Sequence, residues 1–245
     1  MNDIVNLLKS HRSVRKFKTI PIEEDKIKEI IECAQCVSTS SYIQAYTIIR
    51  INNMDKRRSI SNLSGNQKYI EECPLFLVFC ADLNRLKTAC EMNNKVFVEG
   101  YVETFILSTV DVTLAAQNAL IAAESMGLGG VYIGGIRNNP DKISDLLKLP
   151  TNVYPVFGMC LGYPDEDTEN KLRLPMEVVF KTDEYTCDAD VEKLKDYDEQ
   201  IKNYYIKRTN GQREDTWTNQ IGSLMSNPQR PHMKGFLKKQ GFKMK

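Results

Sequence analysis

The sequence predicts an α/β or α+β domain in which helices pack on a central sheet. Apolar runs of strand length, rich in β-branched and aromatic residues, lie at 46–51, 75–80, 131–133 and 153–161. Helical patterns lie between and after these runs. The most apolar of them, at 104–126, contains no proline or glycine and leads directly into the run at 131–133.

Two helices are expected before the first strand. A short amphipathic one is indicated by Ile4, Val5, Leu7 and Leu8. Pro21 opens the second, whose first turn (residues 23–25) has the acidic bias that suits a helix N-terminus. Its apolar positions share one face: Ile27, Ile30, Ile31 and Ala34. Four hydroxyl residues at 38–41, the hydroxyl run, then predict a polar loop.

The helix at 104–126 carries apolar residues over more than one stripe, so we expect burial on most of its sides. Gly127 and Gly129 are expected to supply its left-handed stop. The following strand ends in Gly134 and Gly135, where the backbone can approach a flat ligand. Pro155 indicates that the last strand begins late or lies at an edge.

The chain becomes polar after this strand. Residues 163–175 predict a loop, and residues 190–205 a charged amphipathic helix. The tail has only two acidic residues, Glu214 and Asp215, against many basic ones. The basic ones are Lys207, Arg208, Arg213, Arg230, Lys234, Lys238, Lys239, Lys243 and Lys245.

Composition limits the classes of protein to which this chain can belong. The chain has 245 residues, 42% hydrophobic and 27% charged, as expected of one large globular domain with or without an appended piece. The net charge of +1 gives no global attraction for nucleic acid. We expect no secretory signal and no uncharged apolar run long enough to cross a bilayer. Seven cysteines, an odd number, fit a reducing compartment. A soluble, cytoplasmic protein is therefore expected, with neither nucleic acid nor membrane as its partner.

Missing motifs exclude several enzyme classes. The sequence has no G-x-S-x-G, H-E-x-x-H, Walker A or G-x-G-x-x-G pattern. With only His11 and His232, a His-rich metal site is excluded and a Ser-His-Asp triad is disfavoured. Cys33 and Cys36 have C-x-x-C spacing but no second pair at zinc spacing, and they fall in a predicted helix, so a structural role is favoured.

Two basic groups indicate that the protein binds an anion. His11, Arg12 and Arg15 surround Ser13, and guanidinium forks with a hydroxyl can clamp a phosphate. A second group, Lys171-Leu172-Arg173, lies in the polar loop. Either group alone is more often a solvated surface patch than a binding site. With the hydroxyl run and the glycine-ended strand, they describe a phosphate-bearing ligand with a flat polar ring, without distinguishing flavin from another nucleotide.

Five motifs occur in order: HRSVRKF near the start, GNQKYIEECP at 65–74, DVTLAAQNALIAAESMGLGGVYIGGIRN at 111–138, KLRLP at 171–175 and YYIKRTNGQREDTW at 204–217. With them the chain resembles the flavin-dependent nitroreductases, in particular the NADPH-linked nitroreductase A and flavin reductase group. The resemblance covers nearly the whole chain. It implies an α+β fold with a central mixed, mostly antiparallel sheet flanked by helices, in an intertwined homodimer with a C-terminal excursion.

The resemblance also implies a domain division. The FMN-binding core is expected at 1–162 and 176–200, with a loop at 163–175 that carries Lys171 and Arg173. A C-terminal extension at 201–245 is expected to hold the NADPH-binding segment.

The resemblance places FMN residue by residue. His11, Arg12 and Ser13, with Lys171 and Arg173, match the positions that hold the FMN phosphate and ribityl chain. Arg15 matches the residue at the pyrimidine side of the isoalloxazine, where a fixed cation stabilises the reduced ring. Thr39, Ser40 and Ser41 match the hydroxyl loop that meets flavin from the partner subunit. Gln67 and Tyr69 match residues that make polar contacts to the flavin ring or the ribityl chain. Ile133, Gly134 and Gly135 match the backbone that lies against the flavin.

For the second cofactor, Arg208 matches the arginine that binds the NADPH 2′-phosphate, with Arg213 nearby and Lys207 adding charge. A ping-pong cycle is implied, in which NADPH passes a hydride to FMN and a small-molecule oxidant then accepts two electrons. The implied oxidants are nitroaromatics, quinones or free flavin. Because the flavin carries the hydride, no catalytic side chain and no metal are expected.

Three alternatives remain at this point. A flavoprotein of the same fold could perform another reaction, such as dehalogenation or flavin breakdown, but would be expected to lack the Arg208 segment. A flavin-binding regulatory protein would bind without turnover. A nucleic-acid binder would use the lysine-rich tail at 234–245, where aromatic residues are limited to Phe236 and Phe242.

Overall fold

The computed structural model describes residues 2–167, 169–188 and 190–245. It divides the chain into two compact units: unit 1, made of Met1–Glu169 and His232–Lys245, and unit 2, Asn170–Pro231. These boundaries differ from the expected ranges. Residues 176–200 fall in unit 2, and the last fourteen residues return to unit 1.

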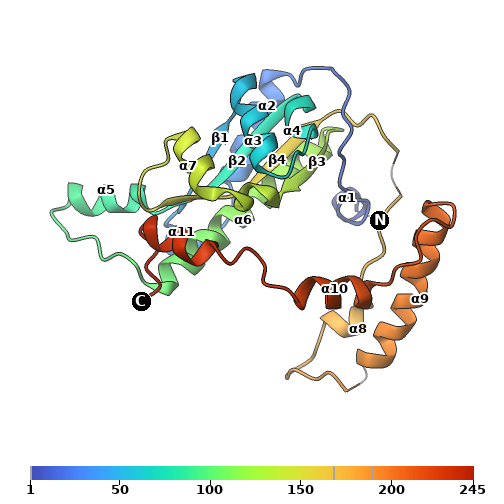
Figure 1. The fold of residues 1–245 in the computed structure, drawn as a ribbon. Coiled ribbons are helices and arrows are strands. Elements are labelled where there is room, and N and C mark those ends of the chain that lie inside the picture. Colours follow the sequence, from blue (N-terminus) through green and yellow to red (C-terminus); the bar gives the residue numbers. More distant parts are fainter. Residues whose placement is uncertain (1, 168, 189) are drawn as a thin grey trace. The chain divides into compact units, whose positions relative to one another are not determined.

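A four-stranded sheet forms the centre of unit 1, in the order β1-β2-β4-β3 (Figure 1). Its strands are β1 (Tyr46–Arg50), β2 (Leu75–Asp82), β3 (Gly129–Ile133) and β4 (Val153–Gly162). All three pairings are antiparallel, and an isolated parallel bridge joins Ser13 to Gly130. The expectation of an α+β fold with a mixed, mostly antiparallel sheet is confirmed.

Helices cover both faces of this sheet (Figure 1). Strand β2 is buried along its whole length and divides its side chains between two cores. Leu75, Leu77 and Phe79 face the core shared with α2 (Glu24–Gln35) and α6 (Val102–Ser125). Phe76, Val78 and Cys80 face the core shared with α3 (Met54–Leu63), α4 (Tyr69–Glu72) and α7 (Pro140–Leu147). This period of two is what a strand buried on both faces requires.

Helix α6 confirms the long apolar helix. Its buried positions are Ser108, Asp111, Val112, Ala115, Ala116, Ala119, Leu120, Ala122 and Ala123. One stripe is not buried in the single chain, because Ile106, Val110 and Leu114 are 47, 48 and 43% exposed. Gly127 ends the helix with φ +79°, as expected. The prediction that Gly129 shares this role is wrong, since Gly129 has no positive φ and begins β3.

Helix α6 is also long and apolar enough, by length and composition alone, to cross a membrane. The helix is not uncharged, because it contains Asp111, so the expectation that no uncharged apolar run of this length exists is not contradicted. Packing explains the composition instead, because 44% of the apolar window is buried inside the protein and the helix carries a buried carboxylate, Asp111.

The prediction that Pro155 puts its strand late or at an edge is wrong. Strand β4 begins at Val153 and lies between β2 and β3. The register shifts here, because Phe79 pairs with Phe157 while the next residue, Cys80, pairs with Pro155. A β-bulge is one of the few places where a strand tolerates proline, since the ladder is already interrupted there.

The remaining helices of unit 1 are α1 (Asp3–Lys9), α5 (Asn84–Met92), α11 (Met233–Lys239) and two 3₁₀ turns, η1 (Ser40–Tyr42) and η2 (Gly134–Asn138). The hydroxyl run is thus partly helical rather than an open loop. Unit 2 contains α8 (Met176–Val179), α9 (Asp190–Arg208) and α10 (Trp217–Met225), around a cluster of Tyr197, Ile201 and Tyr205. The predicted charged helix is confirmed as α9, which begins at Asp190 and continues to Arg208.

The lysine-rich tail is part of the fold of unit 1. Phe236, Leu237 and Phe242 are buried in the same core as α6. Lys239 pairs with Asp141 at 2.9 Å and Lys243 with Glu99 at 2.5 Å. Both aromatic residues of this tail therefore serve packing, and neither is available to stack on a base.

Candidate functional site

The N-terminal basic segment lies along the edge strand β3. The amide of Val14 donates to the carbonyl oxygen of Gly130 at 3.0 Å, and the Val14 side chain is buried. The approach needs glycine in the strand, since a Cβ on Gly129 would lie 2.6 Å from Val14 Cγ2. The sheet edge thus fixes the backbone that carries His11, Arg12 and Arg15.

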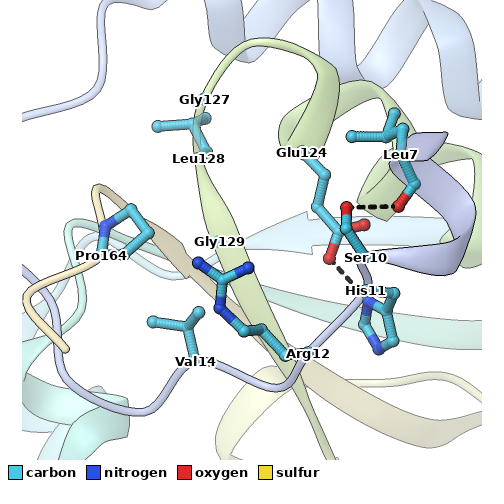
Figure 2. Close-up of a pocket in the computed structure, with 10 residues that line it drawn as sticks. All are labelled: Leu7, Ser10, His11, Arg12, Val14, Glu124, Gly127, Leu128, Gly129 and Pro164. Atoms are coloured by element: carbon cyan, nitrogen blue, oxygen red, sulfur yellow. Dashed lines mark hydrogen bonds and ion pairs between the residues drawn. The ribbon is translucent and has the colours of Figure 1, made fainter. Parts of the chain in front are cut away.

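A cavity of about 200 Å³ opens beside this segment. Figure 2 shows its lining residues, which include His11, Arg12 and Glu124. His11 Nδ1 lies 2.6 Å from a carboxylate oxygen of Glu124, whose side chain is 11% exposed. Arg12 Nε is buried and has no hydrogen-bond partner among the described residues. A buried N–H without an acceptor is costly, so the cavity is suited to an anion that supplies one.

A second group of expected residues comes together beyond Arg15. Tyr69 donates its hydroxyl hydrogen to Gln67 Oε1 at 2.7 Å. Burial raises the pKa of Tyr69, and the neighbouring Arg15 guanidinium partly opposes this rise. Gly135 lies against the same group, because a Cβ there would come within 2.9 Å of Gln67 Nε2. Arg15, Gln67, Tyr69 and Gly135 therefore surround one region.

The end of β3 presents backbone to this region. Ile133 is fully buried in the core, main chain included, so it presents no surface to a ligand in the single chain. At Gly134 an added Cβ would make an ordinary van der Waals contact, with Arg137 Nη2 at 3.6 Å. Of these three residues only Gly134 is partly exposed, since Gly135 is buried as well, and their expected role as backbone against the flavin stays a prediction.

The residues Thr39, Ser40 and Ser41 contact a different part of unit 1. The Ser40 amide donates to Asp111 on α6 at 3.2 Å, and Thr39 Oγ1 accepts from the Gln44 amide at 3.3 Å. Within the described chain no hydrogen bond joins Thr39, Ser40 or Ser41 to the basic segment.

Unit 2 brings together basic residues that were expected at two different cofactors. Lys171 Nζ lies 5.9 Å from the centre of the Tyr205 ring, and the Arg213 guanidinium lies 3.9 Å from the same ring. Arg173 donates to the Lys171 carbonyl oxygen at 2.6 Å. Tyr205 is therefore a common platform for the two groups, since an aromatic face attracts cations.

The arginine expected at the NADPH 2′-phosphate ends helix α9. Arg208 Nη1 donates to the Tyr204 hydroxyl at 2.7 Å, and Lys207 precedes it in the last turn. Arg213 forms an ion pair with Asp215 at 2.9 Å. The pKa of the Asp215 carboxyl is lowered, first by a hydrogen bond from Asn219 and then by the hydrogen bond from Arg213.

Three residues of these sites were missed in the sequence: Glu124, Asp111 and Tyr205. A signal existed for one of them. Asp111 is the only charged residue between positions 104 and 123, and an isolated charge in a buried helix demands a partner. Glu124 and Tyr205 carry no comparable signal, because their partners are distant in sequence or lie on another turn.

Family models match both parts of the chain. The model described as the nitroreductase family matches residues 8–163, and that of the nitroreductase family, C-terminal domain, matches residues 171–245. Among curated proteins, the FMN reductase (NADPH) of Bacillus subtilis is 41% identical and the oxygen-insensitive NADPH nitroreductase of Salmonella typhimurium is 41% identical. Each alignment covers 99% of this chain and 99% of the relative.

Solved structures match over the full chain as well. NfrA1 of B. megaterium has a TM-score of 0.96 at 45% identity, covering 99% of this chain and 100% of that one. The NADPH:FMN oxidoreductase from Vibrio harveyi, solved in complex with NAD+, has a TM-score of 0.91 at 36% identity and covers 100% of both chains.

Proposed function

The chain belongs to the nitroreductase family, and on that premise we propose that it is an NADPH-dependent, FMN-containing oxidoreductase. Its electron acceptors are small oxidants: nitroaromatics, quinones or free flavin. The names of its full-length relatives, FMN reductase (NADPH), NADPH-flavin oxidoreductase and oxygen-insensitive NADPH nitroreductase, support this assignment.

The buried, unpartnered Nε of Arg12 is the observation that carries the proposal. Its cavity is shared with His11, and the donor set suits a phosphate group, because guanidinium and imidazole groups both donate to oxyanions. The FMN phosphate therefore fits this end of the site. The expected contribution of Lys171 and Arg173, which lie in unit 2, stays a prediction of the resemblance.

The flat ring of FMN fits the region around Arg15. Gly134 leaves the main chain open to a ligand, and Gln67 and Tyr69 offer polar atoms beside it. When bound, FMN supplies the redox chemistry, taking two electrons with a hydride from NADPH and giving them to the oxidant in a ping-pong cycle.

In this proposal the protein's own residues bind FMN and orient it. Arg15 places a cation beside the ring, where negative charge develops on reduction. Val14 and Gly130 hold the backbone of the basic segment against the sheet, so the anion-binding side chains project from a rigid edge. No side chain is required to move a proton in the hydride step, which agrees with the chain's two histidines.

Unit 2 is proposed to bind NADPH. Arg208 and Arg213 present guanidinium groups on the surface, and a guanidinium pairs with a phosphate through two parallel donors. Lys207 adds a further charge in the last turn of α9. The additional 2′-phosphate of NADPH makes this basic segment favour NADPH over NADH.

The protein is proposed to act as a homodimer. Ile106, Val110 and Leu114 form an exposed apolar stripe on α6, which a second copy would cover. Residues Thr39, Ser40 and Ser41 make no hydrogen bond with the basic segment in the described chain, so they are free to meet the flavin of the other subunit.

The visible absorption spectrum tests this function. The purified protein is recorded without oxygen, before and after one equivalent of NADPH. We expect an oxidised-flavin spectrum that bleaches fully. A protein that stays colourless after incubation with FMN would overturn the proposal, and a flavin spectrum that NADPH fails to bleach would leave a flavin-binding protein without this activity.

A further inference from the structure

Asp111 is a buried carboxylate that binds main-chain amides outside its own helix. It lies at the centre of α6 and is fully buried, among apolar neighbours that include Val112 and Ala115. Each of its oxygens accepts a main-chain hydrogen bond from outside the helix: Oδ1 from the Ser40 amide at 3.2 Å and Oδ2 from the Ala45 amide at 3.1 Å. Burying a carboxylate is costly unless it is hydrogen-bonded, so these two bonds explain its presence there.

The two amides are the ends of a strained loop, residues 39–45. Within it Ser41, Tyr42 and Gln44 have φ values of +47°, +58° and +51°. Non-glycine residues rarely adopt this left-handed conformation, and bulky residues adopt it least. Three such residues in one short segment persist only where other contacts hold them, and strain of this kind gathers at functional sites.

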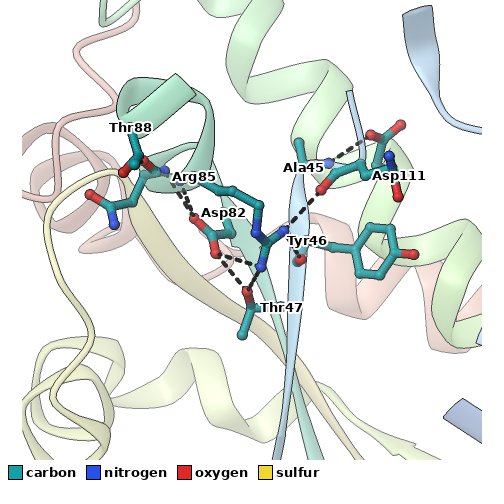
Figure 3. Close-up of polar contacts among 9 residues, drawn as sticks. Ala45, Tyr46, Thr47, Asp82, Arg85, Thr88 and Asp111 are labelled. Carbon is teal, nitrogen blue, oxygen red and sulfur yellow. Dashed lines mark hydrogen bonds and ion pairs between the residues drawn. The ribbon is translucent and has the colours of Figure 1, made fainter. Parts of the chain in front are cut away.

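A second clamp holds the end of the same loop. Arg85 on α5 donates to the carbonyl oxygens of Gln44 and Tyr46 at 3.3 and 3.0 Å. Its guanidinium is itself fixed by Thr47 Oγ1 at 2.9 Å and by Asp82 at 3.6 Å. Figure 3 shows Arg85 on one side of residues 45–47 and Asp111 on the other.

The loop presents its polar groups and one ring outward. Tyr42 is 82% exposed although its backbone is fixed by hydrogen bonds from within the loop. An aromatic side chain left in solvent gains little for the folding of its own chain, since its apolar surface stays in water. The rigid loop is therefore built for a contact outside the single chain.

We propose that Asp111, assisted by Arg85, is a positioning residue that holds the strained loop in the conformation in which it meets the flavin of the other subunit. This inference rests on the proposed function. Asp111 touches no reacting atom, and it acts through the main chain of residues 40 and 45. The ring of the flavin is the part that this loop meets, whereas the phosphate is bound by the basic segment.

The test compares two flavins that differ only in the phosphate. Full-length apoprotein is titrated with FMN and with riboflavin at a temperature where circular dichroism finds each variant fully folded. In Asp111→Asn one acceptor becomes a donor that faces a main-chain amide. Loss of one charged hydrogen bond predicts about tenfold weaker binding or more, by the same factor for both flavins.

Ser108→Ala is the matched control. Ser108 is buried one turn earlier on α6, but among the described residues its hydroxyl bonds only to Phe105 of the same helix. We expect it to lower stability without changing either dissociation constant. The visible band of bound FMN should shift in Asp111→Asn and stay unchanged in Ser108→Ala, since only the first alters what surrounds the ring.

Arg85→Ala tests the same inference about the loop at 39–45 if Asp111→Asn does not fold. The Arg85 side chain is 56% exposed, so the fold tolerates its loss, and Lys87→Ala on the same helix is the control. Weaker binding of both flavins by Arg85→Ala, with Lys87→Ala unchanged, supports the inference. Unchanged dissociation constants in the folded loop variants would overturn it while leaving the proposed function intact. Failure of the unaltered protein to bind FMN would instead remove the proposed function.

Discussion

His11 Nδ1 and Glu124 Oε1 lie 2.6 Å apart, which joins the basic segment to the last turn of α6. A carboxylate can only accept, so Nδ1 carries the hydrogen and the ring is oriented by the helix. The opposite ring nitrogen, Nε2, forms no hydrogen bond among the described residues and remains for a ligand. Glu124 thus positions a group in the proposed phosphate cavity although it repels an anion itself.

Replacing Glu124 with Ala is expected to weaken FMN binding about fivefold, because the His11 ring loses its fixed orientation at a cost of about 1 kcal/mol. Riboflavin binding should change little, since riboflavin lacks the phosphate. Fluorescence titration of the apoprotein with both flavins measures this. Ser125→Ala, whose hydroxyl bonds only within the helix, is the control. Tighter FMN binding by Glu124→Ala would mean that its negative charge matters more than its hold on His11.

Arg12→Ala is expected to weaken FMN binding by about 10- to 100-fold, the amount that one or two charge-assisted hydrogen bonds contribute. The reason is the buried Nε, which finds its acceptor in the proposed phosphate. Riboflavin again serves as the comparison ligand, and Arg58→Ala, a surface arginine of α3, as the control variant. Equal losses for FMN and riboflavin would show that Arg12 supports the fold rather than the phosphate.

Arg208→Ala is expected to raise the KM for NADPH about tenfold and to leave the KM for NADH nearly unchanged. The guanidinium is held at the end of α9 by the Tyr204 hydroxyl, in reach of solvent. Steady-state rates with both nicotinamide cofactors check this, with Lys195→Ala as a control on the same helix. An equal rise in KM for both cofactors would show that Arg208 does not recognise the 2′-phosphate of NADPH.

The sequence could predict the helices and strands because their apolar periods are local. Strand β2 is buried along its whole length, and α6 buries one side of its apolar pattern while Ile106, Val110 and Leu114 stay exposed in the single chain. The position of β4 could not be predicted in this way, since Pro155 is tolerated because β4 itself forms a bulge there against β2. That bulge depends on a partner strand more than seventy residues away in the chain.

The candidate site shows the same difference between residues with a local sequence signal and residues whose role depends on distant parts of the chain. Arg12 and Arg15 stand out in the sequence because charges and hydroxyls cluster around them. Asp111 stands alone in an apolar run, and its role depends on a loop about seventy residues earlier that only the fold brings to it. Residues that hold other residues therefore need the structure, whereas residues that face a ligand carry a local signal.

Gly135→Ala is expected to destabilise the protein by about 1–3 kcal/mol, the usual cost of overpacking. The new Cβ would clash with the carbonyl oxygen of Ser64 and lie 2.9 Å from Gln67 Nε2, and main chain cannot move as a side chain can. Denaturant unfolding measures the change. Gly235→Ala is the control, since nothing lies within 4 Å of its added Cβ and alanine favours the helix there. Equal stabilities for the two variants would contradict the clash.

Val110→Asp tests the proposed homodimer. Val110 is 48% exposed at the centre of the stripe that includes Ile106 and Leu114, and a charge there would stay hydrated in a monomer but be desolvated between two copies. Sedimentation velocity should therefore change from a dimer to a monomer. Flavin binding should weaken with it, because the monomer lacks the loop of the other subunit. Val191→Asp places the same charge at an exposed position of unit 2 and is expected to leave the dimer intact. A dimer that persists in Val110→Asp with unchanged flavin affinity would move the interface away from α6.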